Sequence, residues 1–296
     1  MWRSWIEAMR LRTLPVSIAG VIAGISCAIW HNHFKAIPAL LCLLFAILAQ
    51  IASNFGNEYY DFTNNIDRKG RDGFRRGVTE GDISPKKMKV ATFVTLTFAA
   101  IIGCTLLLFG RWWLLPIGIV ITIFALAYST GPYPLSHHGL GDITVIIFFG
   151  VIPVNITCYL QCGSWEALST SFPTSLAVGL LAANVLIVNN YRDADDDRNV
   201  GKNTTVVIFG RKIMRYAYLL SGISAMCIMI PIWLELPLYA ITAPLFYLCT
   251  HIYLWHSLSK YNGAALNPLL GKTAINLLIF TILLSTFFII FCNAQI

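Results

Sequence analysis

Nine long apolar segments, separated by shorter polar ones, occupy most of the chain. Each has about 20 residues, the length that an α-helix needs to cross the hydrocarbon core of a bilayer. They cover residues 14–30, 38–56, 89–109, 112–130, 143–161, 173–190, 213–233, 236–256 and 272–292. The pattern predicts nine transmembrane helices in one bundle, with a single domain over residues 1–296 and no linker.

The composition supports this class of protein. Hydrophobic residues make up 57% of the chain and charged residues 12%, and the mean hydropathy is +0.68. A soluble domain of 296 residues cannot bury so much apolar surface, so we expect an all-α integral membrane protein in contact with the lipid bilayer. The segment WRSWIEAMRLR, which precedes the first span, mixes tryptophans with arginines and predicts a short helix at the membrane surface.

The basic residues indicate an orientation. Of 21 lysines and arginines, all except Lys35 and Arg111 fall before the first span or in every second connection after it. The positive-inside rule therefore predicts a cytoplasmic N-terminus in a multi-pass protein of the cell inner membrane. Because topology accounts for the net charge of +7, no nucleic-acid partner is expected.

The cysteines and buried polar residues give weaker signals. The eight cysteines lie mostly within predicted spans without paired CxxC spacing, and are read as small core residues. A metal or redox site at Cys158 and Cys162 is disfavoured, since no accompanying histidine or acidic ligand is expected for them. Asn155, Asn184 and Asn276 either line a cavity or link helices, and the sequence leaves both roles open.

Two acidic clusters interrupt the apolar pattern at matched places. The segments NEYYDFTNNID (57–67) and DADDD (193–197) follow the second and sixth predicted spans. Carboxylates at the mouth of a membrane bundle are costly to desolvate, so such clustering indicates that a cation or a substrate holds them there. Their spacing of four spans also suggests two four-helix halves and an additional ninth helix.

The spacing within each cluster brings side chains together. Asn57 and Asp61 are four residues apart, as are Asp193 and Asp197, so each pair shares one helix face. Both pairs are expected to project into a common cavity.

Asp67 is ten residues beyond Asn57 and faces elsewhere on a continuous helix. It joins the site only if the chain unwinds around residues 63–65, which are weak helix formers, and we expect that break. Asp195 and Asp196 are not assigned, because water is an equally good environment for either.

Two opposed carboxylate sets suit Mg²⁺ when a diphosphate supplies further oxygen ligands. Basic residues nearby would hold phosphate oxygens, although positive loops are also normal on the cytoplasmic side whatever the function. These are Arg68, Lys69, Arg71, Arg75, Arg76, Arg198 and Lys202.

Aromatic residues and histidines near the clusters have two interpretations each. The tyrosines either shield a carbocation or belong to the interfacial aromatic belt. They are Tyr59, Tyr60, Tyr128, Tyr133 and Tyr191. His137 and His138 are adjacent and therefore face different ways in regular structure, so they are read as loop residues rather than as a metal-binding pair.

The paired N-x-x-x-D and D-x-x-x-D motifs resemble those of the UbiA superfamily of intramembrane aromatic prenyltransferases, and the likeness covers nearly the whole chain. Further segments resemble the 1,4-dihydroxy-2-naphthoate prenyltransferase branch of menaquinone synthesis. They are MRLRTLP, GFRRGVTEGDISP after the first motif, YSTGPYPLSHHGLGD, NNYRDADDDRNVGKNT with IFGRK, and LNPLLGKTA.

The resemblance implies a site and its ligands. Asn57, Asp61, Asp67, Asp193 and Asp197 would form the two Mg²⁺-diphosphate motifs, as both metal-binding and catalytic residues. Lys202 and Arg76 would hold the diphosphate of a polyprenyl donor. Two departures from the pattern are Glu58, where many relatives have aspartate, and Asn65, which replaces a glycine.

The implied reaction is Mg²⁺-assisted ionisation of polyprenyl diphosphate, attack by 1,4-dihydroxy-2-naphthoate and loss of CO₂, which gives demethylmenaquinone. Arg12 is a candidate for holding the acceptor carboxylate, and Tyr128 and Tyr191 for contacting the donor. Alternative acceptors are 4-hydroxybenzoate and homogentisate. A cation transporter is a distant alternative, since no predicted span carries an acidic residue at its centre. Neither prenyl chain length nor oligomeric state follows from these motifs.

Overall fold

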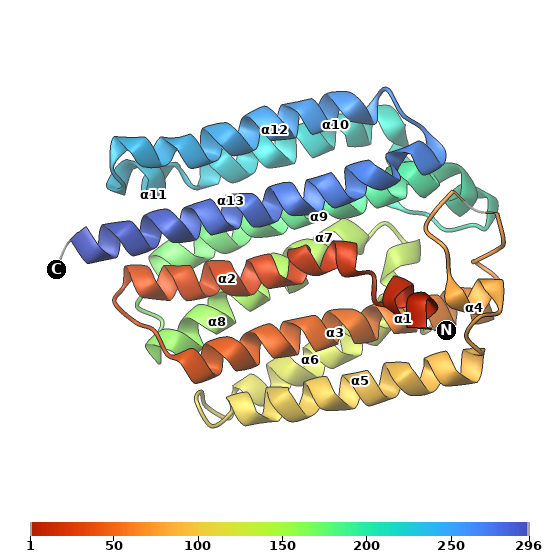
Figure 1. Ribbon diagram of the computed structural model, residues 1–296, viewed down its shortest axis with the longest axis horizontal. Helices are drawn as coiled ribbons and strands as arrows, with labels where there is room; N and C mark the ends of the chain where they lie inside the picture. The colour runs from red at the N-terminus through yellow and green to blue at the C-terminus, as the bar shows by residue number, and fades with distance from the viewer. Residues whose placement is uncertain (1, 71, 295–296) are drawn as a thin grey trace.

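The computed structural model describes residues 2–70 and 72–294, except for the side chains of residues 293 and 294. It is a bundle whose long helices lie roughly side by side (Figure 1). The helices are α1 (Trp2–Met9), α2 (Leu14–Trp30), α3 (Ala36–Thr63), α4 (Gly77–Glu80), α5 (Pro85–Leu106), α6 (Leu114–Ala127), α7 (Gly141–Val145), α8 (Ile152–Cys162), α9 (Leu168–Asn199), α10 (Thr205–Ile228), α11 (Ile230–Glu235), α12 (Thr242–Leu258) and α13 (Asn267–Ala294). The predicted all-α fold is confirmed.

Seven helical segments of the described chain are long and apolar enough to cross a membrane, as expected of a multi-pass membrane protein. They coincide with seven of the nine predicted spans. The predicted segment 112–130 contains only the 14-residue helix α6. The segment 213–233 is divided between α10 and α11, and α10 itself is kinked at Gly210. Both segments are therefore helical, but neither combines the length and the hydropathy of the other seven.

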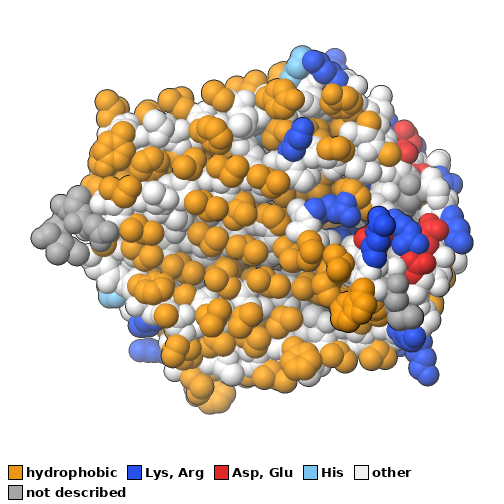
Figure 2. All heavy atoms as spheres, viewed as in Figure 1, with side chains coloured by type: hydrophobic (Ala, Val, Ile, Leu, Met, Phe, Trp, Pro, Cys, Tyr) orange, Lys and Arg blue, Asp and Glu red, His pale blue; other side chains and the backbone are white. Residues whose placement is uncertain are grey.

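Apolar and charged side chains are separated along the bundle. Figure 2 shows an apolar surface over the middle of the helices and a concentration of charged side chains at the end that carries α4 and the N-terminus. A hydrocarbon core covers apolar side chains at little cost and excludes charged ones. The long axis of the bundle is thus the direction in which it would cross a bilayer.

Helix α3 ends at Thr63, and the chain turns before Asp67. Asn65 has a φ of 57°, in the left-handed region that asparagine tolerates better than most residues. The amides of Ile66 and Asp67 both donate to the carbonyl oxygen of Asp61, at 2.9 and 3.1 Å. The break predicted around residues 63–65 is confirmed.

Helix α9 packs very closely against the rod formed by α7, a π-helical turn (Ile146–Val151) and α8. A Cβ added to Gly150 of this turn would lie 2.4 Å from the Cα of Gly179 and 2.4 Å from the carbonyl oxygen of Ser175, both on α9. Small residues at such crossings let two transmembrane backbones approach each other. This packing fixes α9, which carries the second acidic cluster, against the α7–α8 rod.

Replacing Gly150 with alanine should lower the thermal stability of the protein in detergent, because the added methyl group meets backbone atoms that cannot move aside. Overpacking of this kind costs about 1–3 kcal/mol. The measurement is the Tm of the variant. Gly271→Ala on α13 is the control, since a Cβ there meets nothing within 4 Å. Equal Tm values for the two variants would contradict the packing described for α9.

Asn155, Asn184 and Asn276, for which two roles were open, link helices. Asn155 Oδ1 accepts a hydrogen bond from Ser171 Oγ at 2.8 Å. Asn184 Oδ1 accepts from Ser221 Oγ at 2.6 Å, and Asn276 Oδ1 accepts from Thr250 Oγ1 at 2.5 Å. Interhelical hydrogen bonds in membranes contribute about 0.6 kcal/mol on average. Each asparagine thus contributes modestly to helix association.

Candidate functional site

The first acidic motif is assembled by the end of α3 and the turn that follows it. Asp61 and Asp67 are both buried, and one guanidinium lies against both carboxylates. Arg76 Nη2 is 3.6 Å from Asp61 Oδ2, and Arg76 Nε is 3.4 Å from Asp67 Oδ2. Asp67 therefore joins Asp61 through the predicted break in the helix.

Asn57 lies one turn before Asp61 and is fixed by a neighbouring connection. Its Oδ1 accepts a hydrogen bond from Ser129 Oγ, just after α6. Glu58 points elsewhere: its side chain is buried, and its Oε1 accepts from the amide of Val78 at 2.9 Å. The departure at Glu58 thus serves to hold α4, the short helix that directly follows Arg76.

The second acidic motif lies on the last two turns of α9, where the spacing of four residues has the predicted effect. Asp193 and Asp197 are buried, with exposed fractions of 1% and 3%. Asp193 Oδ1 pairs with Arg192 Nε at 2.6 Å, and Asp197 Oδ1 lies 3.5 Å from Lys202 Nζ. Both carboxylates therefore lie inside the bundle with a basic group beside each.

The two unassigned aspartates of DADDD lie on the outer side of α9. Asp195 is exposed and pairs with Arg211 at 3.0 Å, whereas Asp196 pairs with Arg68 at 2.5 Å. The Asp196 contact holds the connection after α3 against α9. The motif thus combines two inward carboxylates with two that bind surface arginines.

Groups of both motifs, Asn57 and Asp61 from the first and Asp193 from the second, line one polar pocket of about 160 Å³. Its charged and amide side chains come from five elements of the chain, so the fold brings together groups far apart in sequence. Those lining it include Arg10, Asn57, Asp61, Arg76, Asn189, Asp193 and Lys202. Asp67 and Asp197 do not line the pocket. They contact two residues that do, Arg76 and Lys202 respectively.

An apolar cavity of about 390 Å³ adjoins the polar pocket. Five residues line both spaces: Gln50, Ser53, Tyr128, Thr144 and Phe149. The cavity runs between α2, α3, α5, α6 and the α7–α8 rod, and two of its α6 residues, Ile119 and Ile123, are more than half exposed. A charged compartment therefore passes into an apolar one that borders the lipid-facing surface.

Arg10 is the site residue that sequence reasoning missed. It has a φ of 53° in the turn after α1 and lines the polar pocket. Among the described residues, no hydrogen-bond partner is present for its buried Nη2 atom. Arg12, the residue predicted to bind the acceptor, is not among the pocket-lining residues and lies over the Phe74 ring, with 3.1 Å from Cζ to the centroid.

Asp82 ties helix α1 to the segment that carries Arg76. Ser4 Oγ donates to Asp82 at 2.8 Å, and Arg75 Nη2 pairs with Asp82 Oδ2 at 2.5 Å. These bonds lower the pKa of Asp82, so its carboxyl group stays ionised at neutral pH. They hold α1 against the loop before α4, and so position Arg10 and Arg76.

The tyrosines and histidines named from the sequence differ in their placement. Tyr128 lies where the two cavities meet. Tyr191 is buried but lines neither cavity, and the Arg211 guanidinium is 5.6 Å from its ring centroid. The His138 ring stacks on Tyr133 at 3.6 Å. Burial, reinforced by nearby Lys202, lowers the pKa of His137, whose imidazole is therefore neutral near pH 7.

The histidine pair belongs to no three-ligand cluster among the described residues. Of the other loop cations, Arg68 and Arg75 pair with surface acids, and Arg71 lies outside the described residues. Arg76 and Lys202 are thus the predicted cations that reach the pocket.

The donor set of the two motifs fits a hard divalent cation. Asn57 offers an amide oxygen, and the four buried aspartates offer carboxylate oxygens, without sulfur or imidazole among them. Mg²⁺ prefers oxygen ligands and commonly shares them between carboxylates and phosphates. The residues present therefore fit the metal implied by the motifs.

The model of one protein family, the UbiA prenyltransferase family, matches residues 17–276. The chain belongs to this family. It is 37% identical over 234 residues to 1,4-dihydroxy-2-naphthoate octaprenyltransferase of Escherichia coli (strain K12). The alignment covers 76% of this chain and 75% of that protein. The protein of the same name from Haemophilus influenzae is 35% identical over 76% of this chain and 75% of that protein.

UbiA-family folds are also found among solved structures. A UbiA homolog from Archaeoglobus fulgidus bound to GPP and Mg²⁺ matches with a TM-score of 0.71 and 16% identity, over 97% of this chain and 99% of that one. A UbiA homolog from Aeropyrum pernix K1 in the apo state gives a TM-score of 0.68 at 17% identity, over 93% and 97% of the two chains. These likenesses show that the bundle has the UbiA fold.

Proposed function

We propose that this UbiA-family enzyme transfers a polyprenyl group from polyprenyl diphosphate to 1,4-dihydroxy-2-naphthoate, with decarboxylation, to give demethylmenaquinol, the hydroquinone form of demethylmenaquinone. The observation that carries the proposal is one polar pocket, lined from both acidic motifs, that continues into an apolar cavity. Such a space suits a molecule with a diphosphate head and a long apolar tail. The names of the E. coli and H. influenzae relatives support the choice of acceptor.

Mg²⁺ would be held by the oxygens of the two motifs and by the donor diphosphate. The protein ligands are Asn57, Asp61, Asp67, Asp193 and Asp197. When bound, the metal supplies Lewis-acid neutralisation of the diphosphate, which favours ionisation of the allylic C–O bond.

Arg76 and Lys202 hold the departing diphosphate. Each already lies beside a carboxylate of the site, at 3.4 to 3.6 Å, and both are largely buried. Cations in a site of low dielectric stabilise developing negative charge far more than they would in water. The two side chains therefore favour bond cleavage rather than ground-state binding alone.

The allylic cation forms where the two cavities meet. Tyr128 and Phe149 line both spaces there, and an aromatic ring face attracts a cation. The apolar walls beyond them exclude water, which would otherwise capture the cation. Tyr128 is thus assigned to cation stabilisation rather than to an interfacial belt.

Arg10 binds the acceptor carboxylate in this scheme, in place of Arg12, because its guanidinium lines the pocket. The acceptor carbon that bears the carboxylate attacks the prenyl carbon and forms the new C–C bond. The carboxylate then leaves as CO₂, and the electron pair of its C–C bond restores the aromatic ring, so no oxidant is required.

The membrane arrangement proposed is nine crossings with a cytoplasmic N-terminus in the cell inner membrane. Helix α6 and the α10–α11 pair supply the two crossings beyond the seven segments that are both long and apolar enough to span a membrane. The gathering of charged side chains at the end with the acidic motifs supports an active site at the cytoplasmic face (Figure 2).

The test is a mass-spectrometric assay of membranes containing the protein, with a polyprenyl diphosphate and equal amounts of 1,4-dihydroxy-2-naphthoate and 4-hydroxybenzoate. The expected result is demethylmenaquinol, detected as such or as the demethylmenaquinone to which air oxidises it, that forms with Mg²⁺ and disappears with EDTA. Prenylated 4-hydroxybenzoate instead would change the acceptor and retain the ionisation. Absence of any prenylated product, with homogentisate also tried, would overturn the proposal, and ion flux in proteoliposomes would then support transport.

Gly118→Phe should shorten the prenyl chains that the enzyme accepts. Gly118 lines the apolar cavity on α6, and a Cβ there meets nothing within 4 Å, so a large side chain would grow into the cavity. We expect kcat/KM for a long polyprenyl diphosphate to fall by about tenfold or more, as for substrates one or two methylenes too long for a pocket. Geranyl diphosphate should be affected less, and equal losses for both donors would contradict this cavity as the tail site.

A further inference from the structure

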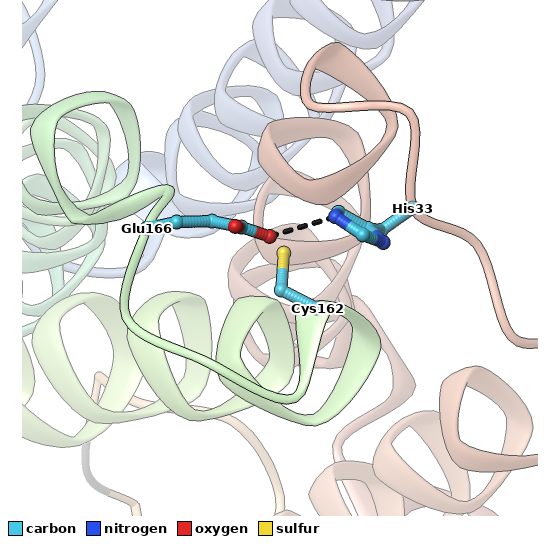
Figure 3. Close-up of side chains that lie close together, drawn as sticks. All are labelled: His33, Cys162 and Glu166. Carbon is cyan, nitrogen blue, oxygen red and sulfur yellow. Dashed lines mark ion pairs between the residues drawn. The ribbon is translucent and has the colours of Figure 1, made fainter.

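A second group of metal-ligating side chains lies at the opposite end of the bundle from the acidic motifs. It consists of His33 in the turn between α2 and α3, Cys162 at the end of α8, and Glu166 in the loop before α9 (Figures 1 and 3). One potential ligand atom from each residue lies within 4.8 Å of the other two. His33 Nε2 is 2.7 Å from Glu166 Oε1, and the Cys162 thiol points towards this pair (Figure 3).

A metal site at Cys162, which was disfavoured from the sequence, is supported by the structure. Cys158 and Cys162 were expected to have no histidine or acidic neighbour, but Glu166 lies four residues beyond Cys162, and the fold brings His33 close to Cys162 and Glu166. Cys158 is buried one turn earlier on α8. The thiol of Cys162 is thus placed between a buried cysteine and two partly exposed ligands.

Bonds that do not involve the ligand atoms hold the His33 turn in place. The residue two before it, His31, contacts Thr170 Oγ1 through Nε2 at 3.0 Å. The residue two after it, Lys35, donates its amide to Gln161 Oε1 at 2.6 Å. The turn is therefore fixed on both sides of His33, to α9 and to α8, so that the three ligands do not depend on a metal for their approach.

The Glu166 loop is fixed in the same manner. Its preceding residue, Trp165, packs against Tyr159, with 4.7 Å between ring centroids, and its following residue, Ala167, is buried. Gly163, with a φ of 82°, ends α8 and lets the loop turn directly after Cys162. Cys162 and Glu166 therefore meet His33 from one compact turn.

The chemistry of these three groups selects a borderline metal. Zinc takes thiolate, imidazole and carboxylate ligands at about 2.0–2.3 Å, commonly as three protein ligands with one open position for water. Tetrahedral bonds of that length place the ligand atoms about 3.5 Å apart, which small side-chain rotations would achieve here. Mg²⁺ prefers oxygen alone, so this cluster and the acidic motifs differ in the metal they suit.

Charge and access are compatible with a divalent cation. His33 and Glu166 side chains are 39% and 50% exposed, so the cluster is open to solvent. The Lys35 ammonium lies close to the cluster, because a Cβ built on Gly163, the residue after Cys162, would be 3.7 Å from Lys35 Nζ. Its positive charge would compete with a metal cation. It would also stabilise the thiolate that metal binding requires, and two anionic ligands outweigh one ammonium.

We propose that His33, Cys162 and Glu166 form a Zn²⁺-class site that joins the α2–α3 turn to the α8–α9 loop. The site lies outside the prenyl-transfer pocket and does not depend on the proposed function. A metal there would connect two segments that are 129 residues apart and stabilise the folded state by mass action.

The test uses Co²⁺ as a spectroscopic substitute for zinc on the full-length protein in detergent. The titration is run in excess Mg²⁺, so that the acidic motifs are occupied. One Co²⁺ per chain, with a thiolate-to-metal charge-transfer band that Zn²⁺ abolishes, is the expected result. Cys162→Ser should remove the band, and His33→Gln should weaken binding by more than about 100-fold, the upper range for losing a residue that only orients a ligand.

Three controls make the test specific. Cys227→Ser removes an exposed cysteine on α10 and should leave the Co²⁺ spectrum unchanged. Asp61→Asn should also leave it unchanged, which separates this site from the Mg²⁺ motifs. Circular dichroism and gel filtration check the fold of each variant. A charge-transfer band that survives Cys162→Ser, or one that Cys227→Ser removes, would overturn the site.

Discussion

Asp193→Asn and Asp61→Asn should each reduce kcat for prenyl transfer by about 10²–10³, the loss typical of removing one preorganised electrostatic group from an active site. Both side chains are buried in the pocket wall, and both are assigned to hold Mg²⁺. Asparagine retains one oxygen and nearly the same volume, so the bundle should fold. The measurement is kcat at saturating donor, with the Mg²⁺ concentration varied for each variant.

Asp195→Asn is the matched control for these substitutions. It changes the same residue type in the same motif, but its side chain is 68% exposed and pairs with Arg211 outside the pocket. Activity within about twofold of the parent protein is expected, since exposed ion pairs contribute at most about 1 kcal/mol. A loss as large as that of Asp193→Asn would show that more of the motif takes part than its two inward carboxylates.

Arg10→Gln should raise the KM for the acceptor by about 10- to 100-fold, because a charge-assisted hydrogen bond to a carboxylate contributes about 1.5–3 kcal/mol. The KM for polyprenyl diphosphate should change much less, since Arg76 and Lys202 remain. Steady-state kinetics with each substrate varied in turn measure both values. An acceptor that lacks the carboxylate, 1,4-dihydroxynaphthalene, should bind the variant and the parent protein equally.

Arg12→Gln is the informative companion of this variant. Arg12 packs over Phe74 and is not among the residues lining the pocket, so its replacement should leave the acceptor KM nearly unchanged. If Arg12→Gln raised that KM and Arg10→Gln did not, the acceptor carboxylate would belong to Arg12, as the sequence suggested. If Arg10→Gln raised only the donor KM, Arg10 would belong to the diphosphate site.

Much of the fold follows from local pattern. Apolar length predicted where helices lie, and spacing of four residues predicted that Asp193 and Asp197 share a buried face. The break before Asp67 was also predictable, because Thr63, Asn64 and Asn65 are weak helix formers at the end of a long helix. Such features depend on neighbours within one or two helical turns, which a sequence displays directly.

Features that depend on tertiary approach were not predictable in the same way. Arg10 and Arg12 are two residues apart and chemically identical, and the left-handed conformation at Arg10 separates their directions. A cluster such as His33 with Cys162 requires two distant turns to meet, and no local periodicity reports that. The signal that was available for Arg10 was its place in the segment MRLRTLP, which did not distinguish it from Arg12.

The junction of the two cavities has a consequence for the fate of the product. Tyr128 and Phe149 border a charged compartment on one side and an apolar one on the other. The donor spans both, because it has an ionic head and a hydrocarbon tail. The proposed reaction removes the diphosphate from the donor and the carboxylate from the acceptor, so the product retains no anionic group to hold it in the charged compartment. The product would then partition into the lipid through the apolar cavity. The reaction itself would therefore favour product release.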